Sequence, residues 1–384
     1  MKVTLYPDND TNLEIYECIP ELIVYDPDNQ IQTSLDKTDD ISSSEIIIFT
    51  QNAIIDGTYN TDKLKEACEK VRDDIRLDAL LIFDTKVPPR TVYKMSKIID
   101  EYDLIPEINM AYTTLIDSNT RVIAATNQTS LEKTKEIYKQ LPQEIKTVKH
   151  IQTAEIIPIL QNAYKDTLVA LSNQTAILSE ALTIDLIEAI DTANIKEGIN
   201  LLYPQPILDN DTIRDSQEII NLANEYGEAS QLSEAIRSTN NYVAYHMAYM
   251  AEKELYLKEH LAMFETTVAV LGVTTDHKLI TQQDNASLIL VDDFVSRDVE
   301  VWVHDDKIPE EIIEEHGAKK ISLDEAYNAD CIIIMTDNPE YKKINPQKIE
   351  KVIITALPIL EYEKFKDKKY SSVGQYRLKK GEML

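Results

Sequence analysis

The stretch that decides the fold prediction is Thr153–Thr183, TAEIIPILQNAYKDTLVALSNQTAILSEALT. Apolar side chains recur along it at the spacing of one helix face, and no turn signal interrupts them over roughly thirty residues. These apolar positions are Ile156, Ile159, Leu160, Ala163, Leu168, Leu171, Ile177, Leu178 and Leu182. A helix of this length usually forms a spine between two lobes or the face of a dimer. We therefore predict a central helical, dimerisation domain over residues 149–262.

Short β-rich runs alternate with helical patterns on both sides of this domain, which is typical of βαβ units and a parallel sheet. The expected strands are Lys2–Tyr6, Glu21–Asp26, Glu45–Thr50, Ala79–Asp84, Thr267–Val273, Asp298–His304, Cys331–Thr336 and Lys351–Ala356. The expected helices outside the central stretch are Thr61–Arg76, Val92–Tyr102, Ser130–Gln140, Thr183–Asn194, Thr212–Tyr226, Gln231–His260, Asn285–Ser296 and Ser322–Asn328. The predicted fold is α/β: two Rossmann-like doubly wound lobes, residues 1–148 and 263–384, joined by the long helix and a small helical domain.

Composition narrows the classes of partner. The net charge of −28 repels nucleic acid and anionic lipid, so neither is an expected partner. We find no signal peptide and no apolar run long enough to span a bilayer, and the three cysteines, Cys18, Cys68 and Cys331, have no metal-type spacing. These features predict a cytoplasmic protein with reduced thiols.

Glycine is scarce. Seven glycines occur in 384 residues, and no two are close enough to form even G-x-G. A phosphate loop needs glycine so that the backbone can approach the pyrophosphate. The chain therefore lacks the usual glycine-rich phosphate cradle.

Three motifs, in chain order, carry a family resemblance. They are Thr85–Thr91 (TKVPPRT), similar to S-T-V-P-P-G-T; Thr153–Asp166 (TAEIIPILQNAYKD), similar to T-A-E-M-x-K-x-x-x-N-x-Y-R-D; and Val268–Val273 (VAVLGV), similar to the strand that opens a C-terminal lobe. With them the chain resembles the nucleotide-sugar 6-dehydrogenases, which oxidise UDP-glucose or UDP-N-acetylmannosamine to uronic acids with two NAD. The resemblance implies an NAD-binding first lobe and a UDP-sugar-binding last lobe, both degenerate here.

The resemblance also assigns the catalytic positions. The family's nucleophilic cysteine, which forms a thioester, falls on Asp211, and the aspartate that follows it falls on Asp215. The lysine that steadies the oxyanion falls on Pro158, while the asparagine four residues later is kept as Asn162. Without a thiol the thioester route is closed.

The binding positions are substituted as well. The family's turn glutamate and the threonine of S-T-V-P-P fall on Leu115 and Lys86. Its sugar-gripping lysine and arginine fall on Asp276 and Gln283, and the later arginine of its D-T-R strand end falls on Leu357. In place of G-x-G-x-x-G the first strand is followed by Tyr6–Asn12 (YPDNDTN), although Asp26 matches the family's ribose-binding acid. This segment thus has aspartates, which repel the pyrophosphate of NAD, the family cofactor, where the family motif has glycines.

Plainer interpretations stand beside these. Asn162 could bond its own helix, and Asp211 and Asp215 could cap the helix near Thr212. The histidines, among them His304 at a strand end, have no metal-type spacing, so we predict no metal site.

Three functions follow as hypotheses. The first is a catalytically inactive family member, kept as a binding or assembly partner in surface-polysaccharide metabolism. Its long helix, Thr153–Thr183, would form a homodimer or a hetero-oligomer with an active paralogue. The second is a divergent NAD-dependent UDP-sugar oxidoreductase, and the third is a ligand sensor.

Overall fold

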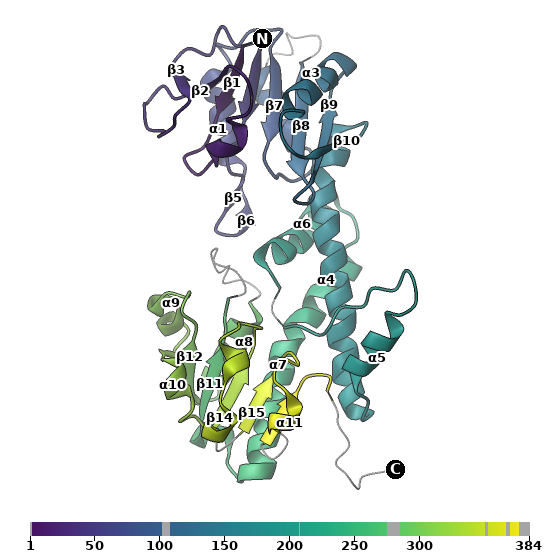
Figure 1. Ribbon diagram of the computed structural model, residues 1–384, viewed down its shortest axis with the longest axis vertical. Helices are drawn as coiled ribbons and strands as arrows, with labels where there is room; N and C mark the ends of the chain where they lie inside the picture. The colour runs from purple at the N-terminus through teal and green to yellow at the C-terminus, as the bar shows by residue number, and fades with distance from the viewer. Residues whose placement is uncertain are drawn as a thin grey trace. The chain divides into compact units, whose positions relative to one another are not determined.

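Residues 1–161 build one eight-stranded sheet in the computed structural model, which describes residues 2–101, 108–206, 208–274, 285–349, 352–365 and 369–375. The strand order is β10-β9-β8-β7-β4-β1-β2-β3, and only β8 and β9 pair antiparallel (Figure 1). The strands are β1 Val3–Tyr6, β2 Leu22–Tyr25, β3 Asp36–Thr38, β4 Ile46–Phe49, β7 Leu80–Asp84, β8 Met110–Leu115, β9 Thr120–Ala125 and β10 Glu144–Thr147, beside a small hairpin of β5 Ile54–Ile55 and β6 Thr58–Tyr59. The order reverses between β1 and β4, as in dinucleotide-binding folds.

Alternate residues of these strands build two cores. Ile47, Phe49, Leu81 and Phe83 pack under one set of helices, while the intervening Ile46, Ile48, Leu80 and Ile82 pack on the opposite face. The helices of this unit are α1 Asp62–Val71, α2 Thr91–Ile99 and α3 Gln128–Tyr138, with a single 3-10 turn, η1, at Leu13–Tyr16. The strands expected in the first lobe are confirmed; the hairpin β8–β9 and the short strands β3 and β10 were not predicted.

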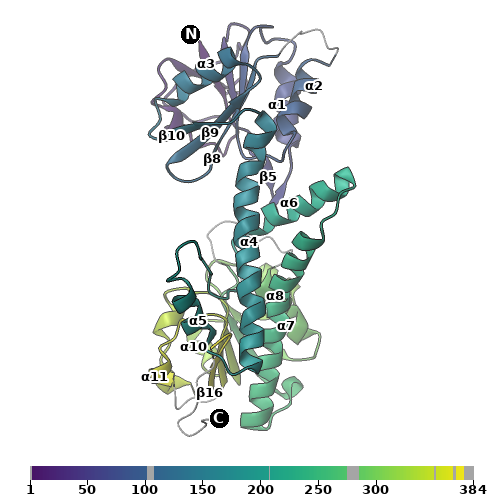
Figure 2. The same cartoon turned by 90° about the vertical axis from the view of Figure 1, so that its right-hand side faces the viewer.

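The long helix is α4, Ile151–Ala181, and Pro158 lies inside it. Figure 2 shows α4 as one continuous helix. Ile151 and Ala154 join a core of the first unit, and Ala176 joins a core of the second. The expected helix Thr153–Thr183 is confirmed, with both ends shifted by two residues.

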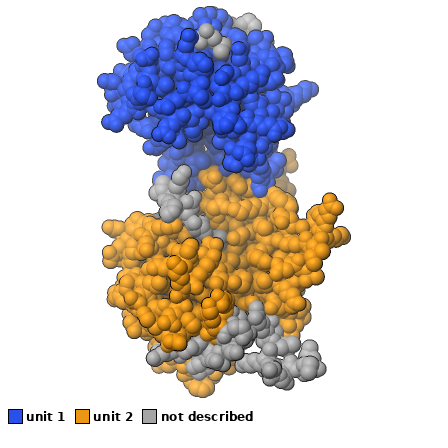
Figure 3. Space-filling view, in the orientation of Figure 1, with its two compact units in different colours: residues 1–161 blue, residues 162–384 orange. Residues whose placement is uncertain are grey.

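Residues 162–384 form the second unit (Figure 3). Its six-stranded sheet has the order β13-β12-β11-β14-β15-β16, and all neighbours run parallel. The strands are β11 Thr267–Leu271, β12 Glu300–His304, β13 Lys319–Lys320, β14 Cys331–Ile334, β15 Val352–Thr355 and β16 Lys369–Ser372. The helices are α5 Leu186–Ala193, α6 Asn210–Tyr226, α7 Gln231–Glu259, α8 Ala286–Val295, α9 Glu310–Glu315, α10 Leu323–Ala326 and α11 Tyr362–Phe365, with 3-10 turns η2 Met263–Glu265, η3 Tyr341–Lys343 and η4 Pro346–Lys348.

The central strands of the second sheet, β11, β14 and β15, are buried on both faces, which explains their nearly continuous apolar sequences. Val268 and Val270 pack with residues of α7 and α8, whereas Ala269 and Leu271 face Tyr341 and the α10 side. Two Rossmann-like lobes are thus present, as the sequence predicts. Among the described residues, none of the helices is long and apolar enough to cross a membrane.

Candidate functional site

The segment that would carry the nucleophile begins α6. Asp209, not Asp211 or Asp215, is the N-cap: its carboxylate accepts a hydrogen bond from the backbone N–H of Thr212 at 2.8 Å. The suggestion that Asp211 and Asp215 cap this helix is therefore wrong. Asp209 also pairs with Lys165 on α4. These hydrogen bonds lower the pKa of Asp209 although burial, the largest influence, acts to raise it.

Asn162, Asp211 and Asp215 are brought together by α4 and α6. Asn162 donates through Nδ2 to Asp215 Oδ2 at 2.5 Å, a bond to α6 where the plainer interpretation expected one to its own helix. The Arg214 guanidinium lies 2.7 Å from Asp211 Oδ1 and 3.0 Å from Asp215 Oδ1. Asp215 is fully buried and Arg214 is 6% exposed. The cluster is an ion-pair network in which Arg214 neutralises the charge of the buried Asp215.

A cavity of about 840 Å³ lies beside this network, within the second unit. Its lining residues come from α4, the segment before α6, and the loops that follow β14 and β15: Lys165, Leu202, Tyr203, Gln205, Leu208, Asp209, Met335, Thr336, Asp337, Lys342, Leu357, Pro358 and Ile359. Asn173 on α4 exchanges hydrogen bonds with the backbone of Gln205 and so fixes one wall. Each lining lysine lies near a carboxylate, Lys165 beside Asp209 and Lys342 3.8 Å from Asp337. The cavity therefore has little net positive charge for an anion.

At the switch point of the first sheet, where NAD would lie, the side chain of Asp8 is bound by protein donors. Asp8 follows β1 and accepts hydrogen bonds from the backbone of Asn9 and Asn52 and from Lys63 Nζ at 2.8 Å. The connection from β1 to β2 contains only the 3-10 turn η1. A pyrophosphate needs glycines and the N-terminus of a long helix, and this segment supplies neither. The residues present do not fit NAD in the family's manner.

Asp26, the candidate ribose-binding acid, is held by its own loop. Its two oxygens accept hydrogen bonds from the backbone of Gln30 and Ile31 and from Lys37 Nζ, each at 2.9 Å. Burial would raise the pKa of Asp26, but these donors hold it below the ordinary value. Both oxygens thus have partners within the loop, and ribose binding stays a prediction.

Glu155, the glutamate of the TAE motif, anchors the TKVPPRT turn. It is fully buried and accepts hydrogen bonds from the backbone N–H groups of Arg90 at 2.6 Å and Val92 at 2.8 Å, at the start of α2. Arg90 takes the place of the motif's glycine and has a φ of +72°, a conformation that favours glycine. Burial is the main cause that raises the pKa of Glu155 to about 7, against the lowering effect of the hydrogen bonds. The two motifs therefore form one structural unit.

Two family models match the chain: the central domain of the UDP-glucose/GDP-mannose dehydrogenase family over residues 152–242, and the UDP binding domain of that family over residues 269–364. The chain belongs to this family. UDP-N-acetyl-D-mannosamine dehydrogenase of Methanococcus vannielii is 25% identical over 71% of the chain, and the namesake of Pyrococcus horikoshii is 21% identical over 82%. The matched region spans 63% of the length of the first relative and 77% of the second.

The chain shares its fold with solved structures of dehydrogenases. UDP-D-ManNAc dehydrogenase of Pyrococcus horikoshii has a TM-score of 0.76 at 18% identity, covering 97% of this chain and 99% of that one. NDP-N-acetyl-D-galactosaminuronic acid dehydrogenase of Methanosarcina mazei has a TM-score of 0.82 at 16% identity, covering 98% and 96%. Both support the two Rossmann-like lobes.

The other residues that the resemblance aligns with functional positions lie in different parts of the chain. Leu115 ends β8 and is 41% exposed, and Leu357, which the resemblance aligns with a family arginine, lines the cavity. Asp276 and Gln283 lie outside the described residues. Cys68 and Cys331 are buried, and burial raises the pKa of each thiol, so neither resembles a nucleophile.

Sequence reasoning missed one residue of the network, Arg214, and the neighbouring pair of Lys165 and Asp209. Arg214 was passed over as an ordinary polar residue, although it lies between the two family positions. Lys165 lies one turn beyond Asn162 on α4, a spacing that puts both on one helix face. Asp209 stands three residues before Thr212, an N-cap pattern that the sequence displays.

Proposed function

We propose that this chain is a non-catalytic member of the UDP-glucose/GDP-mannose dehydrogenase family that acts as a binding or assembly partner in nucleotide-sugar metabolism for surface polysaccharides. The observation that carries the proposal is the network of Asn162, Asp211, Arg214 and Asp215. A carboxylate replaces the thiol, and an arginine neutralises the neighbouring acid. Neither group can form a thioester, and the fully buried Asp215 cannot reach a substrate.

The first lobe supports the same proposal. Asp8 and Lys63 fill the switch point where the family would place a glycine loop, and η1 replaces the helix that would receive the pyrophosphate. Hydride transfer requires bound NAD, and this segment does not offer the contacts by which the family binds it.

An exposed apolar stripe on α4 supports a role in assembly. Tyr164, Leu171 and Leu178 recur every seven residues and are 60%, 46% and 56% exposed. Such a repeat is the pattern of a helix that packs against another helix. We infer that this face pairs with a second copy of the chain or with an active paralogue.

Tyrosines on α7 form a second stripe with the same repeat. Tyr242, Tyr249 and Tyr256 are spaced by seven and are each about half exposed or more. Tyrosine is enriched in protein interfaces because it combines apolar area with a hydrogen-bonding hydroxyl. Two such stripes favour assembly over an isolated chain.

The testing experiment titrates the purified protein with NAD, UDP-N-acetylmannosamine and UDP-glucose by calorimetry, followed by an assay for NADH formation. We expect no NADH and no micromolar NAD binding. Asp211→Cys alone should not create activity, because the lysine, the glutamate and the phosphate loop are also absent. NADH formation by the wild-type chain would disprove the proposal.

A second candidate is a divergent UDP-sugar oxidoreductase. It is favoured by the relatives, which are named UDP-N-acetyl-D-mannosamine dehydrogenases, and by the cavity of about 840 Å³, which has room for a small ligand. In the same titration this candidate requires both NAD binding and turnover. Ligand binding without NAD binding would instead favour a sensor.

A further inference from the structure

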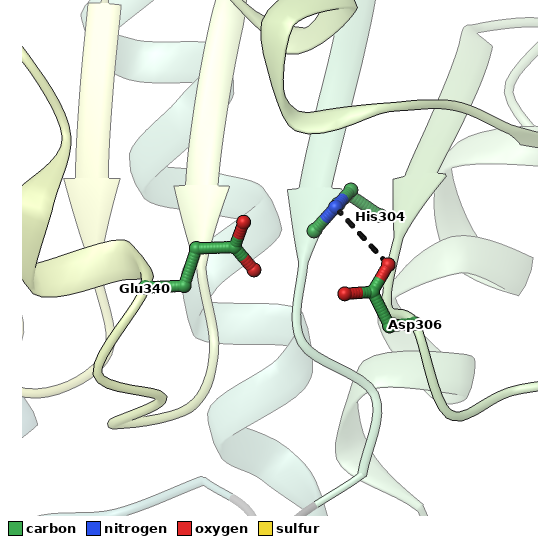
Figure 4. Close-up of side chains that lie close together, drawn as sticks. All are labelled: His304, Asp306 and Glu340. Atoms are coloured by element: carbon green, nitrogen blue, oxygen red, sulfur yellow. Dashed lines mark ion pairs between the residues drawn. The ribbon is translucent and has the colours of Figure 1, made fainter.

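Three potential metal ligands meet at the carboxyl edge of the second sheet. His304 is the last residue of β12, Asp306 follows two residues later, and Glu340 lies in the loop after β14. One ligand atom of each lies within 4.8 Å of the other two. Figure 4 shows both carboxyl groups turned toward the imidazole, and His304 Nε2 is 3.8 Å from Asp306 Oδ1.

The hydrogen bonds of Tyr341 fix which imidazole nitrogen carries the proton. The Tyr341 hydroxyl donates its single proton to the backbone carbonyl of His304 at 2.9 Å. The contact of 3.1 Å between the same hydroxyl and His304 Nδ1 therefore requires that Nδ1–H donates to it. In the neutral imidazole, Nε2 then has a lone pair directed at the two carboxylates. Metal-binding histidines typically donate the N–H of their second ring nitrogen to a fixed acceptor, as His304 does to Tyr341.

The loop that presents these groups is held firmly. Asp305 is buried and accepts hydrogen bonds from the backbone of Val273 and Thr274, each at 2.8 Å, and from Lys307 at 2.9 Å. These bonds fix the backbone between His304 and Asp306. The imidazole, only 4% exposed, is thus a rigid ligand with one nitrogen aimed at the cluster.

We propose that His304, Asp306 and Glu340 bind one divalent transition-metal ion. One imidazole nitrogen and two carboxylate oxygens suit Zn²⁺ or Mn²⁺, whereas Ca²⁺ and Mg²⁺ prefer oxygen alone. Ligands of a tetrahedral Zn²⁺ are about 3.4 Å apart, given metal–ligand bonds near 2.1 Å. The His304–Asp306 contact of 3.8 Å reaches this separation by a small rotation of the Asp306 side chain, which is 83% exposed. Three protein ligands leave further positions for water or for an anionic ligand.

Calorimetry on metal-stripped, full-length protein tests the site, with Zn²⁺ and Mn²⁺ as probes and Ca²⁺ for comparison. We expect one equivalent of Zn²⁺ or Mn²⁺ per chain with micromolar affinity and at least tenfold weaker binding of Ca²⁺. The double variant Asp306→Asn/Glu340→Gln should weaken Zn²⁺ binding at least tenfold and lose the rise in Tm that Zn²⁺ gives the wild type.

A matched control is essential because a chain of net charge −28 attracts cations everywhere. Glu310→Gln/Glu311→Gln removes the same two charges from exposed positions in the first turn of α9 and should bind Zn²⁺ as the wild type does. His304→Gln adds a ligand test, with circular dichroism to verify folding; the carboxylate variant decides if His304→Gln does not fold. Equal Zn²⁺ affinity in the wild type and Asp306→Asn/Glu340→Gln, or equal losses in that variant and the control, would overturn the proposal.

Discussion

Asp215 is a fully buried carboxylate held by Arg214 along α6 and by Asn162 across from α4. Asp215→Asn keeps the shape but leaves the Arg214 guanidinium in the interior with one partner fewer. Breaking one side of a buried ion pair is costly, so we expect a loss of about 3 kcal/mol in the free energy of unfolding. Urea denaturation measures it.

Asp211→Asn is the control for this change, because it also removes a partner of Arg214. The Asp211 side chain is 61% exposed, so its pair is screened by water and should contribute under about 1 kcal/mol. Equal losses for the two variants would show that Asp215 is not the residue that compensates Arg214.

Glu155 predicts a pH dependence of stability. Its pKa is raised, mainly by burial, to about 7 from an ordinary 4.5, so the folded chain holds a proton that the unfolded chain releases. Stability from this group is therefore present below about pH 4.5 and is lost as the pH rises toward 7. Glu155→Gln removes this dependence. The free energy of unfolding of the variant, taken relative to that of the wild type, should therefore rise by on the order of 2 kcal/mol as the pH increases from 5 to 8.

Thermal unfolding at several pH values checks this prediction. Glu69→Gln on α1 removes one charge from the exposed surface and is the control for net charge. A difference between Glu155→Gln and the wild type that is constant from pH 5 to pH 8 would contradict a raised pKa.

At the scale of elements, α6 depends on its N-cap. Asp209→Ala removes the acceptor for the Thr212 N–H and the partner of Lys165, whereas Asp209→Asn keeps the cap alone. We expect Asp209→Ala to lower the free energy of unfolding by about 1–2 kcal/mol and Asp209→Asn by less, as measured by chemical denaturation. Equal effects would mean that the cap is not what stabilises α6.

The elements that the sequence predicted are those with a strong repeat. The sequence predicts α4 because apolar residues recur at helical spacing along its 31 residues. It predicts β4 and β14 because each is an unbroken run of apolar residues. The hairpin β8–β9 was missed because Met110–Leu115 contains two threonines and a tyrosine that give no clear alternation. Pairing with neighbours, not local pattern, makes this segment a strand.

At the scale of the whole molecule, the α4 stripe predicts an oligomer. Leu171→Glu/Leu178→Glu places two negative charges on the exposed stripe. Burying these charges in an interface would cost desolvation free energy, so the variant should not associate. Light scattering after size-exclusion chromatography should show the wild type above 43.8 kDa and the variant as a monomer of that mass.

Leu77→Glu is the control, because Leu77 is also an exposed leucine, at 75%, but lies away from α4 in the sequence. It should leave the oligomer unchanged. If the wild type is monomeric alone, co-expression with an active dehydrogenase tests the hetero-oligomer; separate elution of the two would refute assembly through this stripe.

The sequence alone determined the two-lobed α/β fold and predicted that the family's chemical groups are substituted. Periodicity is a local property, and the absence of a cysteine at Asp211 or of glycines after β1 needs no coordinates. Only the tertiary structure decided what the substituted residues do. Asp215 meets Asn162, 53 positions away, and His304 meets Glu340 across the sheet edge, because packing of helices and strands joins residues that no sequence spacing relates. The sequence shows that residue 211 is an aspartate and not a cysteine, but it does not show the ion-pair network around that position.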